Sequence, residues 1–167
     1  MHLKRRRIEY SGAIYHVTQR GNNHESIFKD VIDKNYYLKL LRLYKEKCDF
    51  KLLGYSIMDN HYHLLLKTEA TPLNKIMHRI GTKYSRYYNM KNERTGHVFS
   101  DRYTAGLIQD EKYLFSALRY IHWNAVRAGI CATVSEYPWS SDHAYRSNDR
   151  KMVSITCENV TCFRFKS

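Results

Sequence analysis

The stretch KLLGYSIMDNHYHLLLKT, residues 51–68, decides the fold of this chain. Aliphatic and aromatic residues dominate both of its halves, as they do in strands that are buried in a sheet. Asp59 and Asn60 separate the two halves, and they are residue types typical of a two-residue hairpin turn. The stretch therefore predicts two antiparallel strands, over 51–58 and 61–68, joined by a tight turn.

The second predicted strand carries two histidines, His61 and His63, one residue apart. Side chains alternate along a strand, so both histidines share one face, while Tyr62 and Leu64 point to the other. Two imidazoles on one face of a rigid strand form half of a metal site. They are equally typical of the solvated face of a half-buried sheet. The pair alone leaves both interpretations open.

Further strand and helix patterns surround this hairpin in a regular order. They predict a strand over 13–20, a helix from Asp30 to about Lys47, a long helix with Thr71 as N-cap, a strand over 103–108, and a final helix over 111–128 capped by Asp110. The order is β-α-β-β-α-β-α. Its first six elements are those of a ferredoxin-like sandwich, an α+β fold with helices on one face of an antiparallel sheet.

The chain of 167 residues is long enough for one domain with a real core. We expect this domain to span 1–145, and the tail over 146–167 has no pattern that predicts a role. No apolar run is long enough to cross a membrane and no signal peptide is evident, so we expect a cytoplasmic, nucleoid-associated protein. The four cysteines form no close C-x-x-C pair, which favours free thiols.

The charge balance is the strongest global signal, with 28 Lys and Arg against 16 Asp and Glu and a net charge of +12. This excess predicts a polyanionic partner, most simply nucleic acid. An anionic membrane is the weaker alternative because no interfacial amphipathic helix stands out. The candidate DNA-binding residues are an N-terminal arm (Arg5, Arg6, Arg7), one face of the long helix (Lys75, Arg79, Lys83, Arg86), and Arg102.

The final predicted helix carries Tyr120 and Asn124, which are neighbours at i and i+4 beside the packing stripe. If this face meets the histidine pair, His61, His63 and Asn124 could hold a metal ion that polarises a phosphodiester. Tyr120 could then attack the phosphorus and form a phosphotyrosine bond. In a chain with 15 tyrosines, any single one is more often a core residue or a base-stacking surface. Tyr88 is the alternative nucleophile, because it is expected to lie off the apolar stripe of its helix.

Five segments of the chain occur in a characteristic order: YHVTQRG (15–21), MDNHYH (58–63), GHVF (96–99) followed by Arg102, YIHWNAVRAG (120–129) and YPWSS (137–141). In this order they resemble the HUH-type single-tyrosine transposases, and most closely the REP-associated tyrosine transposases of bacteria. The resemblance extends over roughly residues 8–141. One departure is Ala125, where the family often has proline, and this change should make the final helix more continuous.

The resemblance implies an enzyme that cuts and rejoins single-stranded DNA at or near an imperfect hairpin, with Mg²⁺ or Mn²⁺. It implies that His61, His63 and Asn124 bind the metal, and that Tyr120 becomes linked to the 5′ phosphate and releases a 3′ hydroxyl. Ligand chemistry alone would favour softer ions such as Mn²⁺ or Zn²⁺. Members of the family act as monomers or as homodimers, so both states are expected here.

Two other functions compete with this one. The first is a non-catalytic hairpin-binding protein derived from a transposase. Such a protein is expected to have lost one or more site residues, whereas His61, His63, Tyr120 and Asn124 are all present. The second is a metal phosphodiesterase that uses activated water. The histidine-triad hydrolases need a third alternating histidine, and Leu65 occupies that position.

Overall fold

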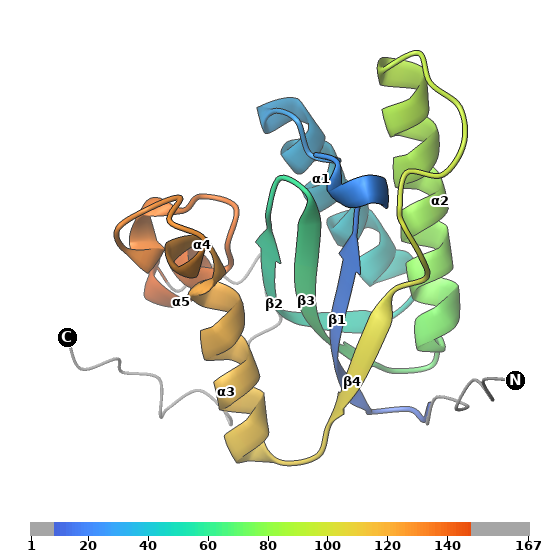
Figure 1. The fold of residues 1–167 in the computed structure, drawn as a ribbon. Coiled ribbons are helices and arrows are strands. Elements are labelled where there is room, and N and C mark those ends of the chain that lie inside the picture. Colours follow the sequence, from blue (N-terminus) through green and yellow to red (C-terminus); the bar gives the residue numbers. More distant parts are fainter. Residues whose placement is uncertain (1–8, 148–167) are drawn as a thin grey trace, which may run out of the picture.

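The computed structural model describes residues 9–147 (Figure 1). Two short 3₁₀ turns lie at Asn22–His24 and Val134–Glu136. The strands and α-helices are β1 (Ile14–Arg20), α1 (Val31–Lys47), β2 (Phe50–Ile57), β3 (His61–Thr68), α2 (Leu73–Lys91), β4 (Thr104–Ile108), α3 (Glu111–His122), α4 (Asn124–Arg127) and α5 (Asp142–Ser147). The predicted arm residues Arg5, Arg6 and Arg7, and nearly all of the predicted tail, lie outside the described residues.

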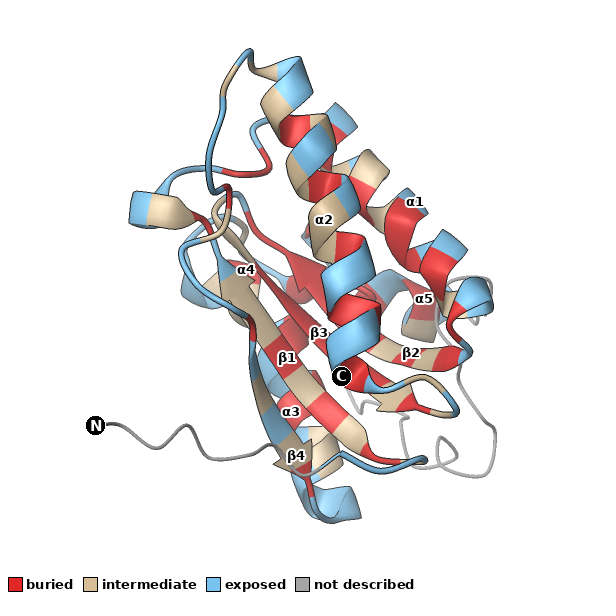
Figure 2. Ribbon diagram, turned by 90° about the vertical axis from the view of Figure 1, so that its right-hand side faces the viewer, coloured by how far each residue is buried: buried red, intermediate tan, exposed pale blue. Residues whose placement is uncertain are grey.

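The four strands form one antiparallel sheet in the order β2-β3-β1-β4. β2 and β3 are the predicted hairpin, and β1 lies between β3 and β4. This is the strand order of the ferredoxin-like sandwich, so the predicted α+β fold is confirmed. α1 and α2 lie side by side on one face of the sheet (Figure 2), and α3 covers part of the opposite face (Figure 1).

β3 is buried on both faces, which explains its unbroken apolar run. Leu64 and Leu66 belong to the main core, between the sheet and the helices α1 and α2. Leu65 points the other way and packs with Leu118 and Ile121 of α3. The face that carries the histidine pair is therefore an interior face, covered in part by α3.

α3 approaches β2 closely at Gly54. A Cβ atom placed on Gly54 would lie only 2.5 Å from Leu118 Cδ1, which is far inside van der Waals contact. The pairing of β2 with β3 shifts its register between Leu52 and Gly54, as at a β-bulge. The missing side chain lets α3 rest directly on the strand, and this close approach sets where the end of α3 lies over the sheet.

The final helix is interrupted, contrary to the continuous helix predicted over 111–128. α3 ends one residue before Trp123, which has φ −80° and ψ 0°, and the short helix α4 follows it. α4 buries Ala125 in a separate small cluster with Met58 and Tyr137. Packing into this second cluster turns the chain away from the axis of α3, which a helix-period pattern cannot reveal.

Other predicted boundaries are correct or one residue off. Asp110 is an N-cap as predicted, and Asp30, where a helix was predicted to begin, is an N-cap as well. Their carboxylates accept backbone N–H bonds of 2.7 and 2.9 Å from the third helical residue. The N-cap position of α2 is Pro72 and not Thr71, and no side chain caps it. β4 begins at Thr104, one residue later than predicted.

The segment after α4 folds back against β2. The Tyr137 hydroxyl donates to the Ile57 carbonyl at 2.7 Å. His122, at the end of α3, is buried, with its Nε2 2.8 Å from Ser141 Oγ and its Nδ1 3.7 Å from Asp142 Oδ1. Burial lowers the pKa of His122 to about 4, so the imidazole is neutral at pH 7. These buried groups are closed to substrate and join α3 to the C-terminal segment.

No helix within residues 9–147 is both long and apolar enough to span a membrane. Cys48 is buried and Cys131 is half-buried, and both are free thiols as predicted. Cys157 and Cys162 lie outside the described residues.

Candidate active site

His61 and His63 share the sheet face that α3 covers, which confirms the predicted alternation along β3. Their ring centroids lie 5.1 Å apart, and the planes are nearly perpendicular at 86°. Tyr62, between them, is buried in the core on the opposite face. His63 is only 7% exposed, which excludes the interpretation of this histidine as a residue of a solvated face.

A third histidine, His16 of β1, lies at the same site. Its Nε2 is 3.0 Å from His63 Nδ1, and the two ring centroids are 5.2 Å apart. In the pairing of β1 with β3, Thr18 is opposite His63 and His16 is its diagonal neighbour. Sequence reasoning missed His16 as a site residue. The alternation of β1 assigns His16 a face, but only the pairing of β1 with β3 places it beside His63.

Tyr120 and Asn124 reach the histidines from the junction of α3 and α4. The Tyr120 ring centroid lies 5.6 Å from that of His63 and 5.9 Å from that of His16, and 42% of Tyr120 is exposed. The Asn124 carboxamide lies close enough to the His61 imidazole to affect its pKa. All four residues that the sequence singled out therefore converge, although the helix that carries two of them is interrupted.

The histidine pair is held neutral. Burial, and after it the neighbouring His16, His61 and Arg20, lower the pKa of His63 to about 3. Burial, followed by the charge of Arg20, also lowers the pKa of His61, and the Asn124 carboxamide, which would accept a hydrogen bond from the protonated imidazole, opposes this shift. His61 Nδ1 lies 2.6 Å from Asn60 Oδ1 and donates to it, because a carboxamide oxygen only accepts. The lone pair of His61 is therefore on Nε2.

These residues fit a divalent metal ion. Two neutral imidazoles offer nitrogen lone pairs, and a metal-binding histidine usually donates its other N–H to an acceptor, as His61 does to Asn60. The Asn124 carboxamide lies near His61, and its oxygen is a ligand type that divalent ions accept. Within residues 9–147, no group of three or more His, Cys, Asp and Glu side chains is arranged as a metal site. The candidate set is therefore completed by an amide.

Two arginines near the site were not singled out from the sequence. The Arg127 guanidinium lies 4.9 Å from the centroid of the Tyr120 ring. Arg20, at the end of β1, is exposed and lies close enough to lower the pKa of both metal-site candidates, His61 and His63. The exposed tyrosine and the histidine pair therefore lie in a positively charged environment.

The predicted DNA-binding residues that lie within the described part of the chain do not gather at this site. Lys75, Arg79, Lys83 and Arg86 are all exposed on α2, which covers the opposite face of the sheet. Arg79 also donates to Cys48 Sγ at the end of α1, at 3.3 Å. Arg102 lies in the segment that leads into β4.

The alternative nucleophile is excluded, because the expectation that Tyr88 lies off the core was wrong. Tyr88 is fully buried, and its hydroxyl donates to the Ser26 carbonyl at 2.8 Å. The segment before α1 covers the side of α2 that the apolar stripe had left open. His97 is exposed in the loop before β4.

The structure thus defines a class of protein, a ferredoxin-like sheet with a cluster of histidines on one face and an exposed tyrosine brought to them by a later helix. Residues 9–124 match the protein family described as "Transposase IS200 like". This match spans more than half of the chain, and the chain belongs to that family.

Individual relatives agree with this assignment. A Haemophilus influenzae protein described as a candidate REP-associated tyrosine transposase is 26% identical over 123 residues, and the alignment covers 65% of this chain and 70% of that protein. The solved structure of a REP-associated tyrosine transposase bound to a REP hairpin superimposes with a TM-score of 0.74 at 18% identity, over 90% of this chain and 88% of that one. A candidate transposase from Deinococcus radiodurans gives a TM-score of 0.50 at 15% identity, over 71% of this chain and 95% of that one. These structures confirm the fold.

Proposed function

We propose that this protein is a DNA endonuclease and strand transferase that cleaves and rejoins single-stranded DNA at or near hairpins through a 5′-phosphotyrosine intermediate. The position of Tyr120 is the observation that carries the proposal. Tyr120 is 42% exposed, and its ring lies 5.6 Å from the ring of the buried His63, centroid to centroid. A nucleophile must be open to its substrate and close to the groups that position the reacting phosphate. Tyr120 satisfies both conditions.

In the proposed step, the Tyr120 phenol loses its proton and its oxygen bonds to the phosphorus of a phosphodiester. The bond from phosphorus to the 3′ oxygen of the preceding nucleotide breaks, and that oxygen takes up a proton as a free 3′ hydroxyl. The reverse reaction rejoins the strand, so no nucleoside triphosphate is consumed. Arg127 places a positive charge against the ring that becomes anionic in this step.

We propose that His61, His63 and Asn124 bind Mg²⁺ or Mn²⁺, which when bound polarises the phosphodiester and neutralises the charge that develops on its oxygens. His61 presents Nε2 because Asn60 accepts its Nδ1 proton. Asn124 lies against His61 and supplies a carboxamide oxygen. Two imidazoles favour Mn²⁺ over Mg²⁺. The resemblance to single-tyrosine transposases is the reason to include Mg²⁺.

The proposed site is complete within one chain. Tyr120 lies against His63 and His16 of the same chain, and Asn124 against His61. A monomer could therefore carry out the reaction, with no tyrosine exchanged between subunits.

We expect the His16→Ala variant to bind Mn²⁺ about 10–100-fold more weakly, the usual cost of losing a partner of a metal ligand. His63 can present Nε2 only if its Nδ1 carries the proton, and His16 Nε2, 3.0 Å away, is the acceptor for that proton. Titration calorimetry with Mn²⁺ measures the affinity. His16→Gln, which retains an acceptor, should recover part of it, and the exposed His97→Ala variant is the control. Unchanged affinity in His16→Ala would show that His16 does not position His63.

We propose that the basic face of α2, formed by Lys75, Arg79, Lys83 and Arg86, contacts DNA phosphates. For the Lys75→Gln/Lys83→Gln double variant, the slope of log affinity against log salt should become shallower by roughly 0.7–0.9 for each phosphate that the variant no longer neutralises. Fluorescence anisotropy with a labelled hairpin at several salt concentrations measures the slope. Lys39→Gln on α1 is the control for loss of an exposed charge. An unchanged slope in the double variant would show that this face does not contact DNA phosphates.

The experiment that tests the function incubates the protein with a hairpin carrying single-stranded flanks, in Mn²⁺ or Mg²⁺, and separates the products on a denaturing gel. We expect a slowly migrating covalent DNA–protein adduct and a released fragment with a 3′ hydroxyl. Cleavage without an adduct would instead assign a phosphodiesterase that uses water. Binding with neither product would assign a non-catalytic hairpin-binding protein. Each of the last two outcomes overturns the proposal.

A further inference from the structure

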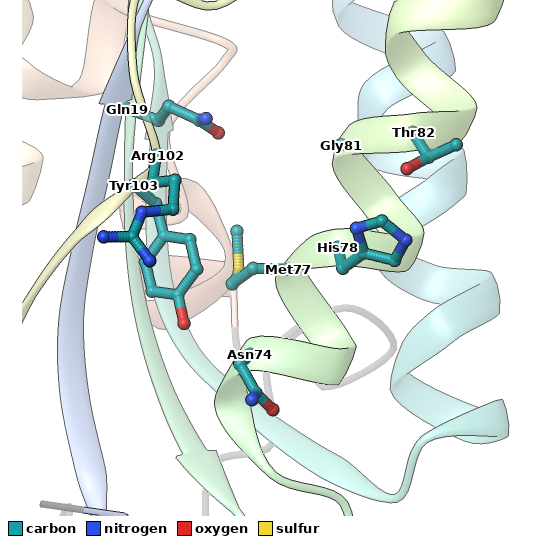
Figure 3. Close-up of a pocket in the computed structure, with 8 residues that line it drawn as sticks. All are labelled: Gln19, Asn74, Met77, His78, Gly81, Thr82, Arg102 and Tyr103. Carbon is teal, nitrogen blue, oxygen red and sulfur yellow. The ribbon is translucent and has the colours of Figure 1, made fainter. Parts of the chain in front are cut away.

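A cleft lies across the sheet from Tyr120, on the side covered by α2. It has a volume of about 340 Å³ and opens between α2 and the segment where β1 ends and β4 begins (Figure 3). Asn74, His78 and Gly81 contribute the α2 wall, and Arg102 and Tyr103 contribute to the opposite wall. The cleft is separate from the histidine site, and none of the proposed catalytic residues lines it.

Gln19 links the cleft to the sheet that carries the histidines. It follows Thr18, the residue paired with His63, and so points to the opposite face. Its Oε1 accepts from the Tyr62 hydroxyl at 2.7 Å, and its Nε2 donates to the Asp101 carbonyl at 2.8 Å. Both bonds hold the Gln19 amide at the edge of the cleft. The cleft and the proposed catalytic site are therefore back to back across one rigid sheet.

The walls of the cleft combine three kinds of chemistry. Met77 and the Tyr103 ring form the apolar floor of the cleft and are largely buried, at 3% and 8% exposed, so only their outer edges are open to a flat group. Asn74 and His78 are exposed and offer hydrogen-bond donors and acceptors. Arg102 supplies a positive charge, and no carboxylate is among the lining residues. Flat surface, polar edges and one cation together match a nucleobase with a phosphate beside it.

Gly81, in the α2 wall of the cleft, is not required by the conformation of its backbone. Gly81 lies inside α2, where glycine weakens a helix, and it is not among the glycines with positive φ. A Cβ atom placed on it would meet nothing within 4 Å, so close packing does not require glycine either. The missing side chain does have one effect, which is to keep the cleft open.

We propose that this cleft binds an unpaired nucleobase of the DNA, with Arg102 contacting the adjoining phosphate. A volume of about 340 Å³ is near the lower end of the ~300–1,000 Å³ range of small-ligand pockets, and it suits one base rather than a duplex. A base can enter such a cleft only when it is out of its stack, which costs least for a base that is already unpaired. The inference rests on the proposed function for the identity of DNA as the ligand.

The test compares Gly81→Leu, which fills the cleft, with Gly81→Ala, which adds one methyl group on the same wall. Affinity for a labelled hairpin with single-stranded flanks is measured by fluorescence anisotropy in EDTA, so that no cleavage occurs. Gly81→Leu should bind about tenfold more weakly, the scale of removing one base from its stacking surface, and Gly81→Ala should stay close to the original chain. Thermal melting should show both variants folded, with Gly81→Ala raised in melting temperature.

A scan of abasic substitutions along the hairpin and its flanks locates the base. Removing the base at one unpaired position should weaken binding to the original chain by about tenfold. The same abasic DNA should bind Gly81→Leu no more weakly than the intact hairpin does, because the leucine side chain already excludes the base.

If a folded Gly81→Leu binds like the original chain, or no abasic position behaves in this way, the cleft is not a base site. Competition by a free deoxynucleoside monophosphate as strong as that of the hairpin would also overturn the proposal. If the original chain does not bind the hairpin at all, the proposed function fails as well. If it forms the covalent adduct while Gly81→Leu binds normally, only the cleft proposal fails.

Discussion

The Tyr120→Phe variant is expected to form no covalent adduct with DNA and to cleave the strand roughly 10³-fold more slowly or worse, the scale seen when a catalytic nucleophile is removed. The substitution deletes the oxygen that bonds to phosphorus and keeps the ring that packs near His16 and His63. Hairpin binding should therefore change little. The denaturing gel measures the adduct, and anisotropy measures the binding.

Tyr113→Phe is the matched control, because Tyr113 lies on the same helix and is similarly exposed, at 45% against 42% for Tyr120. It should form the adduct at the normal rate. Peptide mass spectrometry of the adduct should place the nucleotide on Tyr120. An adduct formed by Tyr120→Phe would show that another residue is the nucleophile.

The His61→Ala and His63→Ala variants are each expected to lose Mn²⁺ affinity by more than about 100-fold, beyond the effect of losing an outer partner such as His16. Each change removes a nitrogen ligand from a set of three, and the remaining imidazole and amide cannot hold the ion tightly. Calorimetry measures Mn²⁺ binding, and the gel should show that the adduct is lost as well.

The controls distinguish a loss of metal binding from unfolding of the variant and from the effect of losing the nucleophile. Thermal melting is essential for His63→Ala, because His63 is only 7% exposed. Tyr120→Phe should bind Mn²⁺ normally and still form no adduct. The exposed His97→Ala should bind Mn²⁺ and form the adduct as the original chain does. Retention of Mn²⁺ affinity in both His61→Ala and His63→Ala would show that the two histidines do not bind the metal.

Much of the fold could be predicted because local signals were strong. The Asp59–Asn60 turn between two apolar runs specified the β2–β3 hairpin, and Asp30 and Asp110 marked two helix starts through their capping bonds. The predictions that failed depended on neighbours distant in the chain. Tyr88 is buried because the segment before α1 covers it, and the final helix turns at Trp123 because Ala125 packs against Met58 and Tyr137.

The candidate site divides in the same way. His61 and His63 share a face by strand alternation, and Tyr120 and Asn124 are neighbours by helical spacing, so each pair could be predicted from its own segment. The positions of Arg20 and Arg127 at the site, and the cleft on the other face of the sheet, could not be predicted in this way. Arg127 reaches the Tyr120 ring across the helix break, and the cleft exists only where α2 passes the start of β4.

The sequence by itself determined the order of elements, the two residue pairs and the family resemblance, because alternation, helical spacing and capping act over a few residues. Only the tertiary structure decided that the pairs meet, because that depends on the close approach of α3 to Gly54 and on the pairing of β1 with β3. It also placed His16 behind His63 and separated the basic face of α2 from Tyr120 by the thickness of the sheet. Contacts between elements far apart in the chain follow from how surfaces pack, and no local pattern in the sequence records them.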